Sequence, residues 1–457
     1  MRKLSILTLL VVLLTTGLGC KGPTKEQQVA SKPVTITYWT VFDNVSELQR
    51  LAGQYNLTRP YVTINIRQLR YEEYQDKFLT ALADDVGPDI ISLHVRDLQK
   101  HASRLSTIPA SVSVANIQTS GGLDPKTTVT LEQNLMPTLT TVRNNYLKTV
   151  ADDVIVNGKI YGLPLTVDTL ALYYNKDLLD SAGIATPPTT WEEFLEAVKA
   201  TTKIDPNDQN SLLQSGVALG TGKNIDNAPD IYALLLAQKG VKVIEDGSVR
   251  FAQNEGRNIS PALESLRFYT DFARSDKEAY SWNESQNNAF DEFVRGKSVF
   301  YFGFGFDYDR IKSRAPQMNL AVTSMLQLSP EAATNVANYW VQTVPKKSKH
   351  QNEAWDFVRF ISTPDNIKAY SAKSHVPSAL RVHNKDQRNE ENPLSPFALQ
   401  VLQAENWYRG NDYAAGQNAL RELITGYLKP YNPEIEDQEE RDAKLIITAA
   451  QTLQQTL

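Results

Sequence analysis

The sequence predicts an α/β protein built from two lobes, and two observations support this fold class. The chain has 457 residues, which is more than a single hydrophobic core usually accommodates, so two lobes or domains are expected. After residue 33, strand-like and helix-like segments alternate. This alternation indicates mostly parallel sheets covered by helices on both faces.

The charge balance limits the partners that the chain can have. The formal net charge is −5 and the basic residues form no block. Nucleic-acid-binding surfaces need clustered lysine and arginine, so we expect no nucleic-acid partner.

The N-terminal segment has the features of an export signal rather than of a folded element. Arg2 and Lys3 precede an apolar run over 4–18, which is shorter than the roughly 20 residues of a membrane-spanning helix. We therefore expect a signal peptide over 1–19. Cys20 follows it and is the only cysteine of the chain, so it has no disulfide partner within the protein.

The surroundings of Cys20 resemble a bacterial lipobox, in which the cysteine is acylated and becomes the mature N-terminus. Gly17 stands where that motif usually has leucine. The resemblance implies anchoring to the membrane through Cys20, outside the cytoplasm. Secretion without lipid or an uncleaved anchor is the alternative. Residues 20–33 are polar and without periodicity, which predicts a lipidated tether.

The next segments predict the first sheet. Alternation predicts strands over 34–42 and 61–69, an apolar run predicts a strand over 87–93, and apolar spacing predicts helices over 45–55 and 71–85. Ligands of such sheets bind beyond the carboxyl ends of the strands. Candidate ligand-binding residues therefore follow these strands, and they are Phe42, Asp43, Asn44, His94 and Arg96.

Residues 98–150 give a weaker pattern. Serine, threonine, proline and glycine concentrate between residues 105 and 129, which favours a loop or an insertion. The following stretch has a helical pattern as far as Met136, and Pro137 is expected to break it.

Further candidates lie later in the chain, at predicted strand exits or beside predicted helices. Asp168 stands in an apolar run, and a polar loop over 221–230 follows the strand "GVALG". Asparagine amides offer donors and acceptors to a polar solute, although helix capping is an alternative role for the asparagines of this loop. The candidates after residue 150 are Asp168, Asn224, Asn227, Trp282, Phe304, Phe306, Trp340, Tyr408 and Arg409.

The ordered set of these segments resembles a known family. "ITYW", "YEEYQDKFLTALADDVGPDIISL", "GKIYGLPLTVDTLALYYNKDLLDSAGI", "FVRGKSVFYFGFGF", "QNEAWDFVRFIS" and "SHVPSAL" look like the extracellular solute-binding proteins of ABC importers, of the maltose-binding-protein type. The likeness covers nearly the whole chain after the tether. The divergent parts are 98–135 and 384–412.

The resemblance implies a type II periplasmic-binding-protein-like fold, in which each lobe is a sheet flanked by helices and a hinge separates the lobes at a cleft. It places 34–164 and 297–342 in one lobe, and 165–296 and 343–457 in the other. Asp168 would lie on the cleft floor, where it either accepts hydrogen bonds from the ligand or pairs with a nearby arginine or lysine. Burying it without a partner would cost several kcal/mol.

The same resemblance implies the function. We expect a monomer that captures a small solute, most plausibly a mono- or oligosaccharide, in the cleft by hinge closure and delivers it to an ABC permease. The chain shows no HExxH, GxSxG or Walker A motif. No catalytic residue, metal or cofactor is therefore expected. A secreted carbohydrate-active enzyme and a surface lipoprotein with a scaffold or adhesion role are the alternatives.

Overall fold

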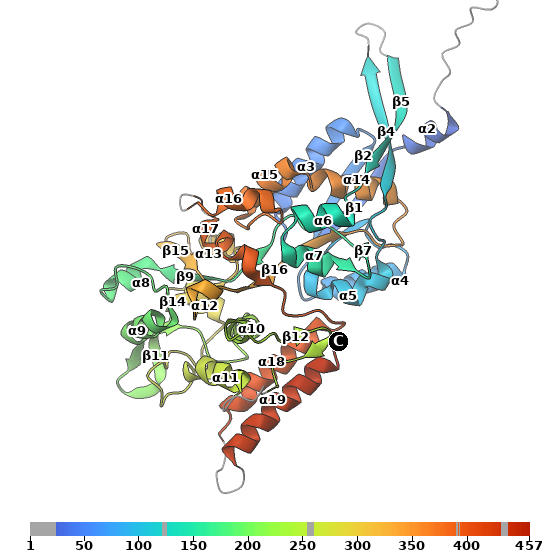
Figure 1. Ribbon diagram of the computed structural model, residues 1–457. Coiled ribbons are helices and arrows are strands. Elements are labelled where there is room, and N and C mark those ends of the chain that lie inside the picture. The colour runs from blue at the N-terminus through green and yellow to red at the C-terminus, as the bar shows by residue number, and fades with distance from the viewer. Residues whose placement is uncertain (1–23, 121–125, 254–259, 390–391, 393, 431–436) are drawn as a thin grey trace, which may run out of the picture.

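The chain folds into two lobes of similar architecture that face each other (Figure 1). The computed structural model describes residues 24–120, 126–253, 260–389, 392, 394–430 and 437–457. Residues 1–23 lie outside this description, and with them the predicted signal peptide and Cys20. Within the described ranges, no helix has the length and apolar character needed to cross a bilayer.

The first lobe, called the N-lobe here, is built on a four-stranded sheet with the order β17-β3-β1-β2. β1 (Val34–Thr40) pairs in parallel with β2 (Val62–Gln68) and β3 (Ile90–His94), while β17 (Trp340–Thr343) runs antiparallel to β3. The predicted strands over 34–42, 61–69 and 87–93 are thus confirmed. Further N-lobe elements are α3 (Val45–Thr58), α4 (Tyr74–Ala83), α5 (Leu98–His101), α6 (Leu139–Asn145), α7 (Lys148–Val154), α14 (Gln351–Ile361) and α15 (Pro364–Ser374).

The divergent segment after β3 is a long hairpin that projects from the N-lobe beside α2 (Lys25–Ala30) (Figure 1). β4 (Ser111–Ser120) and β5 (Lys126–Leu135) pair in antiparallel register. Of the predicted loop or insertion, the structure has an insertion that forms a hairpin, and the predicted helix up to Met136 was wrong. Val112 and Val114 lie on one face of β4 and are buried. The strand packs against α14, and this tertiary contact overrides the local helical pattern.

The second lobe, called the C-lobe here, has a mixed sheet with the order β10-β11-β14-β9-β15. Its strands are β9 (Ala171–Asn175), β10 (Lys203–Asp205), β11 (Asp208–Val217), β14 (Ser298–Gly303) and β15 (Leu320–Ser324). Its helices are α8 (Lys176–Ser181), α9 (Trp191–Thr201), α10 (Ala228–Gln238), α11 (Pro261–Asp271), α12 (Ala289–Val294), α13 (Asp307–Arg314), α17 (Ser395–Ala398), α18 (Tyr413–Leu428) and α19 (Gln438–Gln454). Helix α9 begins in a capping box between Thr190 and Glu193.

Two separate hydrophobic cores define which residues belong to each lobe. The N-lobe core runs from Ile36 to Val167 and from Ala337 to Leu380, with additions at Val401 and Ala404. The C-lobe core runs from Leu170 to Val336 and from Phe397 to Leu453. The chain therefore crosses between lobes near residue 168, near residue 336, and between residues 380 and 397.

These cores correct the predicted lobe boundaries. The first crossing lies close to the expected position, but 297–336 belongs to the C-lobe and 343–380 to the N-lobe. The error arose at β14, which is buried along its whole length. It pairs with β11 and β9 in the middle of the C-lobe sheet. A central strand and a crossing strand both appear as continuous apolar runs, so the sequence pattern did not separate them.

A short sheet joins the two lobes at the first two crossings. β8 (Asp168–Thr169) and β16 (Asn335–Asn338) are antiparallel, and β18 (Ala404–Glu405) lies parallel to β16 on the other side. We call these three strands the hinge sheet. Its two edges, β8 and β18, face two different interlobe cavities.

Asp356 of α14 ties several N-lobe elements together. The Tyr55 hydroxyl donates to its carboxylate at 2.9 Å, the Asn134 amide of the hairpin at 2.8 Å, and Arg359 at 2.8 Å, while Arg59 forms an ion pair at 3.4 Å. Asp356 is fully buried. The carboxylate thus links α3, the hairpin and α14.

We expect Asp356→Ala to lower the free energy of unfolding by about 3–5 kcal/mol. The substitution removes one of the two carboxylates that pair with the buried Arg59, and it leaves the Tyr55 hydroxyl and the Asn134 amide without their acceptor. Urea unfolding followed by circular dichroism measures this change. Asp180→Ala removes an exposed carboxylate of the same type and should change stability by less than about 0.5 kcal/mol. Equal effects of the two substitutions would contradict the role of Asp356.

Candidate functional site

A cavity of about 260 Å³ lies between the lobes at the β8 edge of the hinge sheet. Both lobes and both crossing strands contribute to its walls. We call it the cleft cavity. It is lined by Phe42, Asp43, Asn44, Gln68, Thr166, Asp168, Phe306, Asp309, Arg310, Asn338, Tyr339, Trp340, Tyr370, Ser374 and Val376.

Aromatic rings from both lobes meet at this cavity. The ring of Phe42, which follows β1, stacks on Phe306 of the C-lobe with centroids 5.1 Å apart and an interplanar angle of 19°. Trp340 meets Phe42 edge-on at 5.7 Å, and Tyr71 stacks on Phe42 at 5.8 Å. Phe42 is 41% exposed and Tyr71 37% exposed. The rings therefore form an apolar surface that remains accessible from solvent.

Asp168 lies where the first crossing enters the C-lobe, and its carboxylate holds a loop of that lobe. The backbone N–H groups of Thr169 and Gly305 donate to Oδ1 at 2.8 and 2.7 Å, and that of Phe306 donates to Oδ2 at 3.0 Å. A Cβ at residue 305 would lie 2.9 Å from Oδ1 and 2.8 Å from the carbonyl oxygen of His375. Glycine therefore allows this close approach, and the approach positions the ring of Phe306.

Of the two roles expected for Asp168, the ion pair with arginine or lysine is replaced by this set of backbone donors. Burial raises the pKa of Asp168 to about 7, and the three N–H donors act in the opposite direction. The carboxyl also lines the cavity, so a contact with solute is compatible with its position.

Asp43, at the end of β1, accepts hydrogen bonds from several hydroxyl and amide groups of the N-lobe. Thr40 Oγ1 donates at 2.5 Å, Tyr370 OH at 3.3 Å and Gln342 Nε2 at 3.3 Å, and Ser92 also donates. Burial raises the pKa of Asp43, and these donors lower it in part. With Asp168 and Asp309, the cavity lining therefore contains three carboxyls.

Asn44 lines the cavity, and its side chain caps the N-terminus of α3. Its side chain accepts from the N–H of Glu47 at the start of α3, and its amide donates to the carbonyl oxygen of Lys373 at 3.2 Å. Its backbone N–H donates to Tyr370 OH at 2.8 Å. Asn44 thus joins the β1 exit to α15.

Sequence reasoning missed several residues of this wall. Gln68 is the last residue of β2, so the strand-exit rule could have identified it. Arg310 lies four residues after the candidate Phe306, and its guanidinium pairs with Asp307 at 2.5 Å. Tyr370 and Ser374 carried no signal, because α15 was assigned to the wrong lobe.

His94 and Arg96 lie deeper between the lobes than the cavity. His94 Nε2 is 2.5 Å from Asn338 Oδ1, and its ring stacks on Tyr413 of the C-lobe at 5.4 Å. Burial and the charge of Arg96 lower the pKa of His94 to about 3. Arg96 forms an ion pair with Asp230 of the C-lobe at 2.7 Å. The structure therefore places both residues in an interlobe contact instead of the cavity wall.

Five other candidates are held inside the C-lobe, away from the cavity, and these expectations are corrected. Trp282 and Phe304 are 1% exposed, and Tyr408 is fully buried. Asn224 accepts from Trp282 Nε1 at 3.0 Å, and Asn227 donates to the carbonyl oxygen of Phe302 at 3.1 Å. Their polar atoms are used to fix loops and side chains of the lobe itself.

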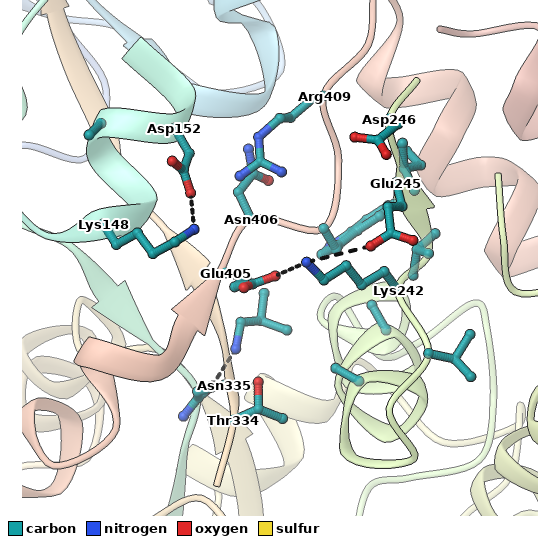
Figure 2. A pocket seen from close by; sticks show the side chains of 18 of the residues that line it. Lys148, Asp152, Lys242, Glu245, Asp246, Thr334, Asn335, Glu405, Asn406 and Arg409 are labelled. Atoms are coloured by element: carbon teal, nitrogen blue, oxygen red, sulfur yellow. Dashed lines mark hydrogen bonds and ion pairs between the residues drawn. The ribbon is translucent and has the colours of Figure 1, made fainter. Parts of the chain in front are cut away.

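Arg409 lines a second, larger cavity of about 670 Å³ at the β18 edge of the hinge sheet (Figure 2). Its Nε donates to Asp153 at 2.6 Å. Other charges there are paired as well: Lys148 with Asp152 at 2.5 Å, and Lys242 with Glu405 at 3.5 Å (Figure 2). This cavity combines paired surface charges with little aromatic surface, so it fits a small solute less well than the cleft cavity does.

The raised pKa of Asp168 predicts a pH dependence of stability. A carboxyl that holds its proton more tightly when folded stabilises the protein fully below its usual pKa of 3.8, and this contribution is lost as the pH rises to about 7. Over that range we expect Asp168 to lower the free energy of unfolding by up to about 1.4 kcal/mol per pH unit. Urea unfolding at a series of pH values measures the slope.

Asp168→Asn should remove this contribution, while Asp180→Asn, at an exposed position, should keep the wild-type profile. If Asp168→Asn shows the same slope as the wild type, Asp168 is not the titrating group.

Comparisons with known proteins agree with this architecture. The family model described as "Bacterial extracellular solute-binding protein" matches residues 51–393, well over half of the chain. The GacH receptor of Streptomyces glaucescens GLA.O, whose structures include an acarbose complex, superposes with a TM-score of 0.68 at 18% identity, over 93% of this chain and 98% of that chain. This likeness shows a shared fold.

Curated relatives match part of the chain. The multiple sugar-binding protein of Streptococcus mutans serotype c is 22% identical over 276 residues, 59% of this chain and 64% of that protein. The lactose-binding protein of Rhizobium radiobacter is 27% identical over 202 residues, 40% of this chain and 42% of that protein. The chain spans about half the length of the curated relatives that it matches. On the family match and the shared fold together, this protein belongs to the bacterial extracellular solute-binding proteins.

Proposed function

We propose that this protein is the substrate-binding component of an ABC import system and that it captures a saccharide in the cleft cavity. The observation that carries the proposal is the composition of that cavity. Aromatic faces of Phe42, Phe306 and Trp340 lie beside carboxyl and amide groups of Asp43, Asp168 and Asn338, and both lobes contribute. A sugar ring has an apolar face for stacking and hydroxyl groups at its edge for hydrogen bonds.

The charges of the cavity favour a neutral solute over an anionic one. Its carboxyls are Asp43, Asp168 and Asp309, and Arg310 is the single cation of the lining set. Arg310 already pairs with Asp307 at 2.5 Å. A phosphate ester would therefore meet carboxylates without a free cation, whereas hydroxyl groups can donate to these acceptors.

Hinge closure provides the capture mechanism. Phe42 and Phe306 belong to different lobes, so a sugar held between the two walls binds both of them only when the lobes are together. A ligand shifts the population toward the conformation that it binds more tightly. The bound, closed form is the form that we expect a permease to recognise.

The named relatives support the same substrate class. The Streptococcus mutans relative is named for multiple sugars and the Rhizobium radiobacter relative for lactose. Membrane attachment through Cys20, and a location outside the cytoplasm, belong to this proposal and rest on the lipobox resemblance.

We expect Phe306→Ala to weaken saccharide binding by about tenfold, because the substitution removes a stacking face worth about 0.5–1.5 kcal/mol in addition to buried apolar area. Isothermal titration calorimetry with glucose, galactose, maltose, cellobiose and lactose measures the affinities. Leu213→Ala, at a C-lobe position that is 54% exposed, should leave them unchanged.

Two results would count against the proposal. Equal saccharide affinity of the Phe306→Ala variant and the wild type would show that Phe306 does not contribute to binding. If chromatography shows that the protein cleaves the disaccharides into smaller sugars, the alternative of a carbohydrate-active enzyme is favoured.

We expect Cys20→Ala to release the protein from the membrane fraction, because the thiol that receives the lipid is lost. Fractionation of expressing bacteria, followed by immunoblotting, measures the distribution. Ser5→Ala, in the same N-terminal segment, should leave the protein in the membrane fraction. Retention of the Cys20→Ala variant in the membrane would contradict lipid anchoring.

A further inference from the structure

Between the cleft cavity and the second cavity at the β18 edge, side chains of the two lobes pack against each other. His94 and Arg96 come from the N-lobe, at the end of β3 and just after it. Asp230 in the first turn of α10 and Tyr413 at the start of α18 come from the C-lobe. We call these four residues, with Asn406 and Trp407, the interlobe wall. Asn406 and Trp407 follow β18, and all six side chains are buried.

Arg96 is the centre of the wall and is only 2% exposed. Its guanidinium pairs with Asp230 at 2.7 Å, and its Nε donates to Asn406 Oδ1 at 3.2 Å. The rings of Trp407 and Tyr413 lie 5.2 and 5.0 Å from the guanidinium carbon, and the Tyr413 hydroxyl accepts a further hydrogen bond. A charge with this many partners is well compensated in a buried position.

The wall begins directly behind the cavity. Asn338 and Trp340 line the cavity, and both contact His94: Asn338 Oδ1 lies 2.5 Å from His94 Nε2, and the ring of Trp340 lies 5.3 Å away. His94 in turn stacks on Tyr413, whose hydroxyl bonds to Arg96. The cavity is thus closed at this end by a continuous packed layer.

We propose that the interlobe wall restricts this receptor to short saccharides of one or two rings, and that the Arg96–Asp230 pair sets the limit. The inference rests on the proposed saccharide function and deepens it. The cavity volume of about 260 Å³ lies just below the roughly 300–1,000 Å³ of common small-molecule sites. One or two rings fill such a space.

The physical reason is that Arg96 and Asp230 meet when the lobes are together as they are here. A longer saccharide that extended from the cavity toward Tyr413 would stand between these two charges. Closing around it would leave a guanidinium and a carboxylate desolvated and separated, which is far less favourable than the buried pair. Long saccharides therefore hold the lobes apart and lose the contacts that closure supplies.

The test is a length series on the wild-type protein, measured by isothermal titration calorimetry. The probes are glucose, maltose and maltotetraose, together with cellobiose and cellotetraose. We expect the best mono- or disaccharide to bind at least tenfold more tightly than the tetrasaccharide of its series. A tetrasaccharide that binds as tightly as its disaccharide, or more tightly, overturns the inference and leaves the proposed function intact. Absence of binding by every saccharide overturns both.

The double variant Arg96→Ala/Asp230→Ala identifies the residues that set the limit. It removes both charges, so neither is left buried alone. Tetrasaccharide affinity should rise at least tenfold relative to that of the disaccharide. Lys199→Ala/Glu278→Ala removes an exposed ion pair of 2.9 Å on the C-lobe and should leave the ratio unchanged. A thermal unfolding transition shows whether the wall variant is folded. If it is folded and the affinity ratio is unchanged, Arg96 and Asp230 do not set the length limit. If that variant does not fold, the length series on the wild-type protein still tests whether the receptor is restricted to short saccharides.

Discussion

The side-by-side passage of β8 and β16 between the lobes is the constraint on which the cleft depends. Asp168 and Thr169 pair with Asn338 and Ala337 across this boundary. The Asn335 side chain adds to the pairing, because its amide donates to the carbonyl oxygen of Leu170 at 2.9 Å and its oxygen accepts from the Leu170 N–H at 3.2 Å. These contacts fix how the two lobes face each other at the first two crossings.

The buried charged groups near this hinge have different structural roles. Asp168 holds the Gly305–Phe306 backbone and thereby fixes one aromatic wall of the cavity. Arg96 and Asp230 hold the lobes against each other at the far end. In both cases several donors or acceptors offset the cost of burying the charge, and at Asp168 they offset it only in part. These groups are stabilised only when their partners, which come from distant parts of the chain, are in place. They therefore help to specify how the lobes are arranged.

The two interlobe cavities differ because the hinge sheet has two different edges. At the β8 edge, aromatic residues and carboxyls from strand exits converge. At the β18 edge, lysine, arginine, aspartate and glutamate side chains pair on a wider surface. Strand exits collect functional side chains because the carboxyl ends of parallel strands open toward the crevice. The β8 edge therefore has the composition of a binding site.

The sequence by itself determined the fold class, the N-lobe strands and the first crossing near Asp168. Strand-exit position also pointed to Phe42, Asp43 and Phe306, and the family resemblance pointed to Asp168 and Trp340 at the crossings. Local periodicity has this power because it reports which face of an element is buried.

Only the tertiary structure decided the later crossings, the hairpin of 111–135 and the true surroundings of the buried polar side chains. Trp282 and Phe304 have the residue types of a binding site but are surrounded by their own lobe, and Tyr370 reaches the cavity from a helix far away in the chain. Burial between two lobes depends on which distant segments pack together. That pairing is not encoded in any local pattern, so a central strand, a crossing strand and a cavity wall can have the same sequence character.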